Sequence, residues 1–169
     1  MKLHRASLAA LTVLLFVPLL ASAQSSAPVI LHPAETTKLL PEAVFFRGQS
    51  APVQTRNSAG IHFPDGMYTL ATLVDNSGYS TGIQQKYQAY FITEVPLDFS
   101  GHTLHPGAYG TGIVNGKFLV MDIAANDLFT VPTVHDTAIK RPTPLQLDAD
   151  GDHYRLYFGR NYVVFSRAK

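Results

Sequence analysis

The segment from Tyr87 to Phe99 constrains the fold more than any other part of the sequence. Its odd positions carry Tyr87, Ala89, Phe91, Thr93, Val95, Leu97 and Phe99, and its even positions carry Gln88, Tyr90, Ile92, Glu94, Pro96 and Asp98. Side chains of an extended strand point alternately to its two faces, so this pattern predicts a strand with one more apolar face. Because Pro96 cannot donate to a sheet ladder, the far end is expected to be an edge or a bulge.

Other short apolar runs lie between turn residues. Pro64-Asp65-Gly66 and Pro106-Gly107 are turn signals, and Asn115-Gly116 is the signature of a two-residue type I′ hairpin. The expected strands lie near residues 44–46, 67–74, 87–99, 108–114, 117–123, 128–131, 145–147, 154–158 and 162–165, with one or two short strands near residues 53–56 and 61–63. About eight to ten strands at this spacing predict an all-β fold, either an antiparallel β-sandwich or a small β-barrel. No segment of helical period and useful length follows residue 42.

Residues 1–23 have the three parts of an export signal. Lys2 and Arg5 form a basic start, Leu8 to Leu20 is an apolar run, and Ala21-Ser22-Ala23 is a small-residue cleavage site. The run is shorter than the about 20 apolar residues that a spanning helix needs. We therefore expect cleavage, no membrane span afterwards, and a bacterial protein that is periplasmic or secreted.

The mature chain is expected to form one domain. Residues 24–42 are punctuated by prolines and form a leader, in part disordered, with a short helix over Ala34 to Leu40. Residues 43–169 form a single β domain, because no linker or repeat interrupts them.

Composition excludes several classes of function. The chain has no cysteine, which excludes disulfides, thiolate metal sites and cysteine nucleophiles. Without the signal, 11 basic residues face 12 acidic residues, a formal net charge of −1. Since nucleic-acid binders normally carry a basic excess, we expect no nucleic-acid partner.

Gly78-Tyr79-Ser80-Thr81-Gly82 matches the Gly-x-Ser-x-Gly motif of hydrolases. In those enzymes the serine lies on a sharp turn between a strand and a helix, and the Asp and His partners follow in the chain, as Asp127 and His135 do here. The apolar residues after Gly82 alternate, which is typical of a strand and not of a helix. We therefore interpret the motif as a loop between strands, and a serine hydrolase using Ser80 stays as an alternative hypothesis.

Two further groups could hold a metal ion. Asp148-Ala149-Asp150-Gly151-Asp152 resembles the start of a calcium loop, but Gly159 stands where the ligand glutamate of an EF-hand would be. His102 and His105 are three residues apart, a spacing that places them on opposite faces of a strand. We interpret both groups as turn or loop residues and expect no metal and no cofactor.

The favoured binding residues lie on two expected strands. Gly110 and Gly112 share one face of a strand, where glycine indicates either a groove floor or room for a large aromatic side chain. Tyr109 lies beside them, and Arg155 and Tyr157 can bind an anion or a sugar by hydrogen bonds and stacking. We take Tyr109, Gly110, Gly112, Arg155 and Tyr157 as the candidate ligand-binding residues, with no catalytic residue among them.

Four segments carry a resemblance to known proteins. Phe46-Arg47-Gly48-Gln49-Ser50, residues 86–96, Pro106-Gly107-Ala108-Tyr109-Gly110 and residues 157–162 resemble small exported proteins of acidobacteria, a group without an established activity. The resemblance implies an exported β-rich protein and transfers no functional residue.

These observations favour a non-enzymatic binding or accessory module outside the cytoplasm, with a small-molecule or protein partner still to be identified. A third hypothesis is an envelope interaction module that presents a sheet edge to a partner.

Overall fold

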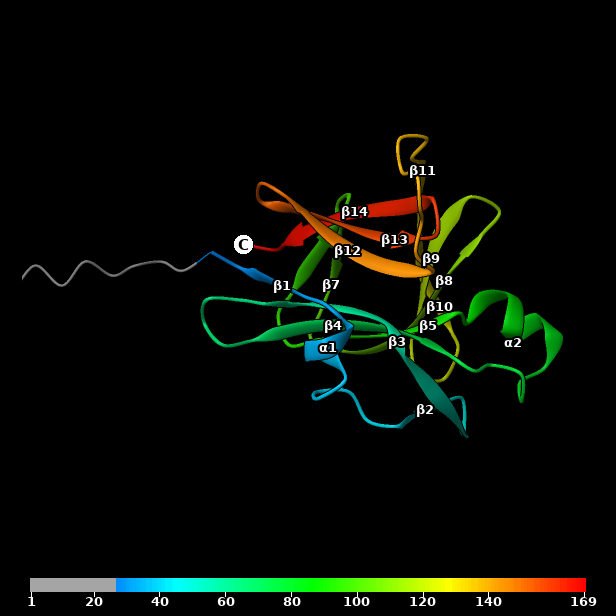
Figure 1. Cartoon of the computed structure of the whole chain (residues 1–169). Helices are drawn as coiled ribbons and strands as arrows, with labels where there is room; N and C mark the ends of the chain where they lie inside the picture. Colours follow the sequence, from blue (N-terminus) through cyan, green and yellow to red (C-terminus); the bar gives the residue numbers. More distant parts are fainter. Residues whose placement is uncertain (1–26) are drawn as a thin grey trace, which may run out of the picture.

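The computed structural model describes residues 27–169, so the signal expected at residues 1–23 lies outside the described residues. Two antiparallel sheets pack face to face (Figure 1). Within the described residues the strand order of each sheet has two ends, so the sheets form a sandwich and not a closed barrel. The predicted all-β class is therefore confirmed.

The first sheet has the order β1-β3-β4-β5-β8-β9-β10, and β2 pairs with the first residues of β3. Its strands are β1 (Val29–Leu31), β2 (Ala43–Phe46), β3 (Gln49–His62), β4 (Tyr68–Val74), β5 (Ala89–Thr93), β8 (Gly107–Val114), β9 (Lys117–Met121) and β10 (Asp127–Pro132).

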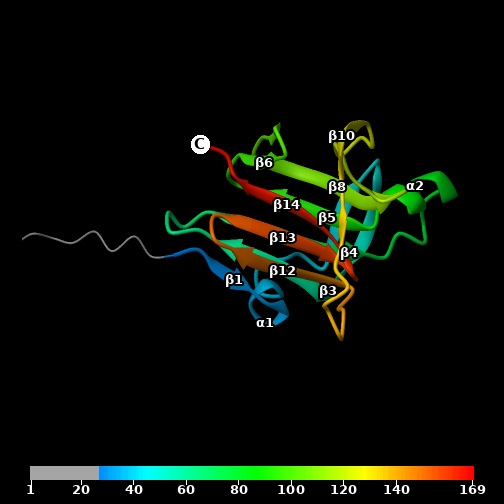
Figure 2. The same ribbon diagram turned by 90° about the horizontal axis from the view of Figure 1, so that it is seen from above.

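The second sheet has the order β12-β13-β14-β6-β7, and β11 pairs with β14. Its strands are β6 (Leu97–Phe99), β7 (His102–Leu104), β11 (Val134–His135), β12 (Leu145–Asp150), β13 (His153–Phe158) and β14 (Asn161–Arg167). Figure 2 looks onto β12, β13 and β14, which lie over the strands of the first sheet.

The alternating segment forms two strands separated by a bend at Glu94 and Val95, and the two strands belong to different sheets. It forms β5 in the first sheet, crosses at Pro96 and continues as β6 in the second sheet. The odd positions from Ala89 to Phe99 are all buried, as the alternation predicts. The strand after Pro96, β6, is not an edge strand, because it pairs with β14 on one side and with β7 on the other. Pro96 instead lies where the chain crosses from one sheet to the other.

Two other expectations concern β3 and the hairpin at Asn115-Gly116. The short strands expected near residues 53–56 and 61–63 are parts of the single long strand β3, which has a bulge between Gln54 and Ser58.

Asn115 and Gly116 have φ values of 52° and 72° and join β8 to β9. Two successive positive φ values are those of the type I′ turn that the sequence predicts.

Aromatic side chains from both sheets fill the core. The ring of Phe99 stacks on Phe118 at a centroid distance of 5.6 Å and on Phe165 at 5.1 Å. All three side chains are almost fully buried. The space between the layers is thus occupied by the protein's own side chains.

Residues 27–169 contain two short helices, α1 (Pro33–Thr36) and α2 (Thr81–Lys86). The leader expected at residues 24–42 thus contributes β1 and α1 in its described part, and the helix is shorter than expected. The helix α2, of six residues, occupies the segment after Ser80 whose alternation predicts a strand, and it caps a second apolar cluster on the outer face of the first sheet. Neither described helix has the length and apolar character that crossing a membrane requires.

Candidate functional site

The five candidate residues lie at three separate places. Gly110 and Gly112 are on the outer face of the first sheet, and that face is covered. A Cβ atom on Gly110 would lie 2.4 Å from the Phe46 ring, and one on Gly112 would lie 2.3 Å from the carbonyl oxygen of Lys86. The glycines therefore make room for an aromatic side chain and for the end of α2, which is the packing alternative left open by the sequence.

Tyr109 points to the opposite face of β8. Its ring packs against the core between the sheets, and its hydroxyl donates to the carbonyl of His105 at 2.9 Å. The alternation of strand side chains thus separates Tyr109 from the two glycines.

Arg155 and Tyr157 lie together on the outer face of the second sheet. The Tyr157 hydroxyl donates to the Asp136 carboxylate at 3.1 Å, and Tyr157 is 2% exposed. Arg155 forms an ion pair with Asp150 and lies over the Tyr162 ring at 5.4 Å. Both side chains are thus engaged by the protein itself.

Ser80 has part of the context that a hydrolase motif requires. It follows β4 and is the N-cap of α2, so the motif does lie between a strand and a helix. However, its backbone is in ordinary extended geometry, with φ −61° and ψ 150°. No histidine among residues 27–169 hydrogen-bonds to its hydroxyl. The geometry therefore lacks the strained turn and the general base of a nucleophile elbow.

The candidate metal ligands have other partners. His102 stacks on Phe129 with ring centroids 4.9 Å apart, and Asp150 pairs with Arg155. Gly151, at φ 62°, turns the chain between β12 and β13. The described part of the chain contains no group of three His, Asp or Glu residues placed to hold a metal ion.

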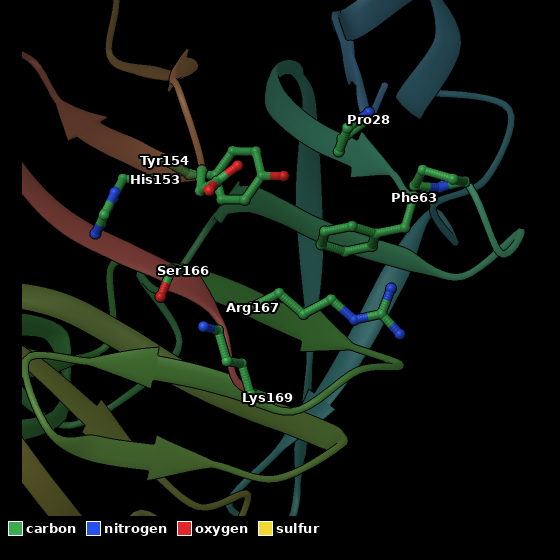
Figure 3. A pocket seen from close by; sticks show the side chains of 9 residues that line it. Pro28, Phe63, His153, Tyr154, Ser166, Arg167 and Lys169 are labelled. Carbon is green, nitrogen blue, oxygen red and sulfur yellow. The ribbon is translucent and has the colours of Figure 1, made fainter. Parts of the chain in front are cut away.

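A pocket of about 480 Å³ lies at the end of the sandwich where β1 begins and β14 ends (Figures 1 and 3). We call it the end pocket. Its lining comes from the residue before β1, the β3–β4 turn, the β12–β13 turn and the C-terminal segment. The lining residues are Pro28, Phe63, Pro64, Asp152, His153, Tyr154, Ser166, Arg167 and Lys169.

Two nearly buried aromatic rings form the floor of the end pocket. Phe63 and Tyr154 meet edge to face, with ring centroids 6.1 Å apart, and are 2% and 5% exposed. The Arg167 guanidinium lies over the Phe63 ring at 5.1 Å and forms an ion pair with Asp65 at 2.5 Å. The hydrogen bond from Arg167 lowers the pKa of Asp65, so the carboxylate stays charged and holds the guanidinium in place.

The Tyr154 hydroxyl is the polar end of an almost buried ring. It forms no hydrogen bond with any residue in the described range, although the ring is almost buried. Figure 3 shows this hydroxyl pointing to the side where Pro28 and Phe63 lie. Burial raises the pKa of Tyr154, and the nearby Asp152 carboxylate raises it further, so the hydroxyl keeps its proton and can donate.

The polar lining of the end pocket combines several hydrogen-bond donors with one carboxylate, Asp152, which only accepts. Arg167 ends β14 on the same face as Phe165, whereas Ser166 lies on the opposite face of the strand. Lys169 follows the strand and forms no ion pair with another described residue. Donors above an aromatic floor suit a ligand with several acceptor oxygens and one apolar face.

Sequence reasoning missed the end pocket. Tyr154 stood out only as one of several C-terminal tyrosines, and Phe63 and Arg167 carried no motif. A comparison with protein-family models, with curated proteins and with solved structures finds no match for the chain.

Proposed function

We propose that the chain is an exported binding module that holds a small ligand rich in acceptor oxygens, of the sugar-acid class, in the end pocket. The observation that carries the proposal is the Tyr154 hydroxyl, which has no hydrogen-bond partner among the described residues and stands at the edge of an almost buried ring, in a pocket that also contains a guanidinium anchored by Asp65. Export to the periplasm or the medium is supported by the signal-like residues 1–23.

The size of the pocket fits this class of ligand. Small-molecule sites usually occupy about 300–1,000 Å³, and the end pocket falls within that range. The carboxylate of a sugar acid would accept from Arg167, which Figure 3 shows extending toward Phe63, while the apolar face of its ring would lie on the exposed edges of Phe63 and Tyr154. A hydroxyl oxygen of the ligand would accept from Tyr154.

Calorimetric titration with D-glucuronate, and with D-glucose as the neutral match, tests the proposal. We expect saturable binding of glucuronate that raises the melting temperature, and weaker binding of glucose, because glucose lacks the carboxylate. No saturable heat with either sugar at millimolar concentration would contradict the proposal.

Two tyrosine variants locate the site. Tyr154→Phe removes one unpartnered hydroxyl, so it should leave the melting temperature unchanged and weaken glucuronate binding about tenfold. Tyr109→Phe removes a hydroxyl outside the end pocket and should leave binding unchanged. Equal affinity of the wild type and Tyr154→Phe would place the ligand elsewhere.

A further inference from the structure

The strand β12 has one unpaired edge. It is the end strand of the second sheet, paired with β13 alone, and Figure 2 shows it at the margin of that layer. An unpaired edge presents backbone N–H and C=O groups that can pair with another chain. This inference concerns that edge and is independent of the end pocket.

The strand register shows which residues face the free edge. Leu145 lies opposite Phe158, and the N–H of Gly159 donates to the carbonyl of Pro144 at 3.2 Å. This bond makes Leu145 and Phe158 a non-hydrogen-bonded pair of the antiparallel ladder. The even residues of β12 therefore bond to β13, whereas Leu147 and Ala149 direct their N–H and C=O groups to the free edge. No described turn, loop or side chain forms a hydrogen bond with the N–H and C=O groups of Leu147 and Ala149.

A groove of about 250 Å³ runs beside this strand. Residues 143–148 form one wall, and residues 56–59, at the bulge of β3, form the other. His32 and Pro33 close one part of it. Side chains of an added strand that point toward the first sheet would enter this groove.

The solvent-facing side of β12 carries two carboxylates, Asp148 and Asp150, with one guanidinium, that of Arg155 on β13, opposite Asp148 in the register. Asp148 is exposed, and within the described residues its only partner is the side-chain amide of Gln146, at 3.2 Å. Asp150 is also exposed, although it pairs with Arg155. Self-pairing of two copies is disfavoured in the register that places Asp148 opposite Asp150, since like charges directly opposite are destabilising. The acidic face instead complements a basic partner.

We propose that β12 accepts an extended basic peptide segment of a partner protein as an additional antiparallel strand of the second sheet. Basic side chains at alternate positions lie beside Asp148 and Asp150, and the intervening side chains enter the groove. Backbone hydrogen bonds to Leu147 and Ala149 supply affinity, and the alternate side chains supply specificity.

The probe is a seven-residue peptide of alternating lysine and valine, acetylated and amidated, with binding followed by fluorescence anisotropy. In antiparallel pairing, residues that exchange hydrogen bonds share a face, so the valine amides bond to Leu147 and Ala149. N-methylation of the valine amides should abolish binding, and N-methylation of the lysine amides should leave it intact. Equal binding of both methylated peptides would overturn strand addition, and so would equal binding of a peptide with glutamate in place of lysine.

Protein variants test the same edge. Ala149→Pro removes an N–H that faces the free edge, and we expect at least about tenfold weaker binding. Ala149→Ser keeps that N–H and should bind normally. Asp148→Asn should weaken binding and reduce its salt dependence, whereas Asp152→Asn, in the turn beyond the strand, should change neither.

The methylated peptides test the intact protein, so the proposal remains falsifiable even if Ala149→Pro lowers stability. Analytical sedimentation of the protein alone tests whether a second copy of the chain occupies the edge of β12. A dimer that Ala149→Pro abolishes and that excludes the peptide would assign the edge to a second copy and overturn the proposal.

Discussion

Tyr87 occupies an unusual place for a polar side chain. It is fully buried, and its ring stacks on Phe46 at a centroid distance of 3.9 Å. Its hydroxyl is the only buried side-chain polar atom without a hydrogen-bond partner among the described residues. Burial raises the pKa of Tyr87, so the hydroxyl is neutral, but its lost hydrogen bond to water is not replaced.

Removal of this hydroxyl should stabilise the protein. We expect Tyr87→Phe to raise the free energy of unfolding by about 1 kcal/mol, because the ring packing is kept and an unsatisfied polar group is lost. Denaturant unfolding measures the change. Tyr79→Phe is the matched control, since the Tyr79 hydroxyl donates to Phe46 and Gln49 carbonyls and its loss should lower stability by a similar amount. A destabilised Tyr87→Phe variant would show that the hydroxyl has a partner.

At the scale of elements, the contact between β8 and α2 depends on glycine. Gly112 allows the backbone carbonyl of Lys86 to approach β8, and this carbonyl cannot move away as a flexible side chain could. We expect Gly112→Ala to lower the free energy of unfolding by about 1–3 kcal/mol, the usual range for overpacking.

Gly82 in α2 provides the opposite case. No atom lies within 4 Å of a Cβ placed there, and its φ is not in the left-handed region. Gly82→Ala should therefore raise the free energy of unfolding by about 0.5–1 kcal/mol, because alanine reduces the entropy of the unfolded chain. Thermal unfolding of Gly112→Ala and Gly82→Ala measures both changes in stability. Equal changes in the two variants would contradict the claim that β8 and the end of α2 can pack closely only because residue 112 is glycine.

The segment after β11 is held by Asp136. Its carboxylate accepts from the N–H of Ala138 at 2.8 Å and from the Tyr157 hydroxyl. These contacts, the bond from Ala138 first, lower the pKa of Asp136 below 3.8. Because the pKa of Asp136 is lower in the folded protein than in the unfolded chain, the carboxylate stabilises the folded protein at pH values above 3.8. This contribution disappears as the pH falls through the pKa that Asp136 has in the folded protein.

The melting temperature of Asp136→Asn should therefore lie below that of the wild type at pH 7, and the difference should vanish as acid protonates Asp136. Melting curves across this pH range provide the test. Asp152→Asn serves as the control, because the Asp152 carboxylate accepts no hydrogen bond from a described residue. A difference that persists at low pH would contradict the assignment.

Local sequence patterns predicted most strands because their causes are local. Alternation predicts Ala89 to Phe99, and Asn115-Gly116 alone is sufficient for the hairpin between β8 and β9. The helix α2 has six residues, fewer than two turns, so its period is too short to recognise. The end pocket escaped prediction for a different reason. Phe63, Tyr154 and Arg167 meet only through sheet packing, which no local pattern encodes.

At the scale of the whole molecule, one aromatic side chain joins both layers. Phe99 belongs to the second sheet, stacks on Phe118 of the first sheet and on Phe165 of its own sheet, and meets Phe91 edge to face at 6.2 Å. Because these contacts cross the sandwich, the two sheets should unfold together and not as separate units.

We expect Phe99→Ala to lower the free energy of unfolding by about 3–5 kcal/mol, since truncation leaves a cavity between the sheets. Denaturant unfolding followed by tyrosine fluorescence and by far-UV circular dichroism should give coincident transitions in the wild type and in the variant. Phe45→Ala is the control, because Phe45 is 61% exposed and its truncation should change stability by less than about 0.5 kcal/mol. Separate transitions for the two probes would mean that the two sheets unfold independently. The end pocket would then be lost in the first of the two transitions, because residues of both sheets line it.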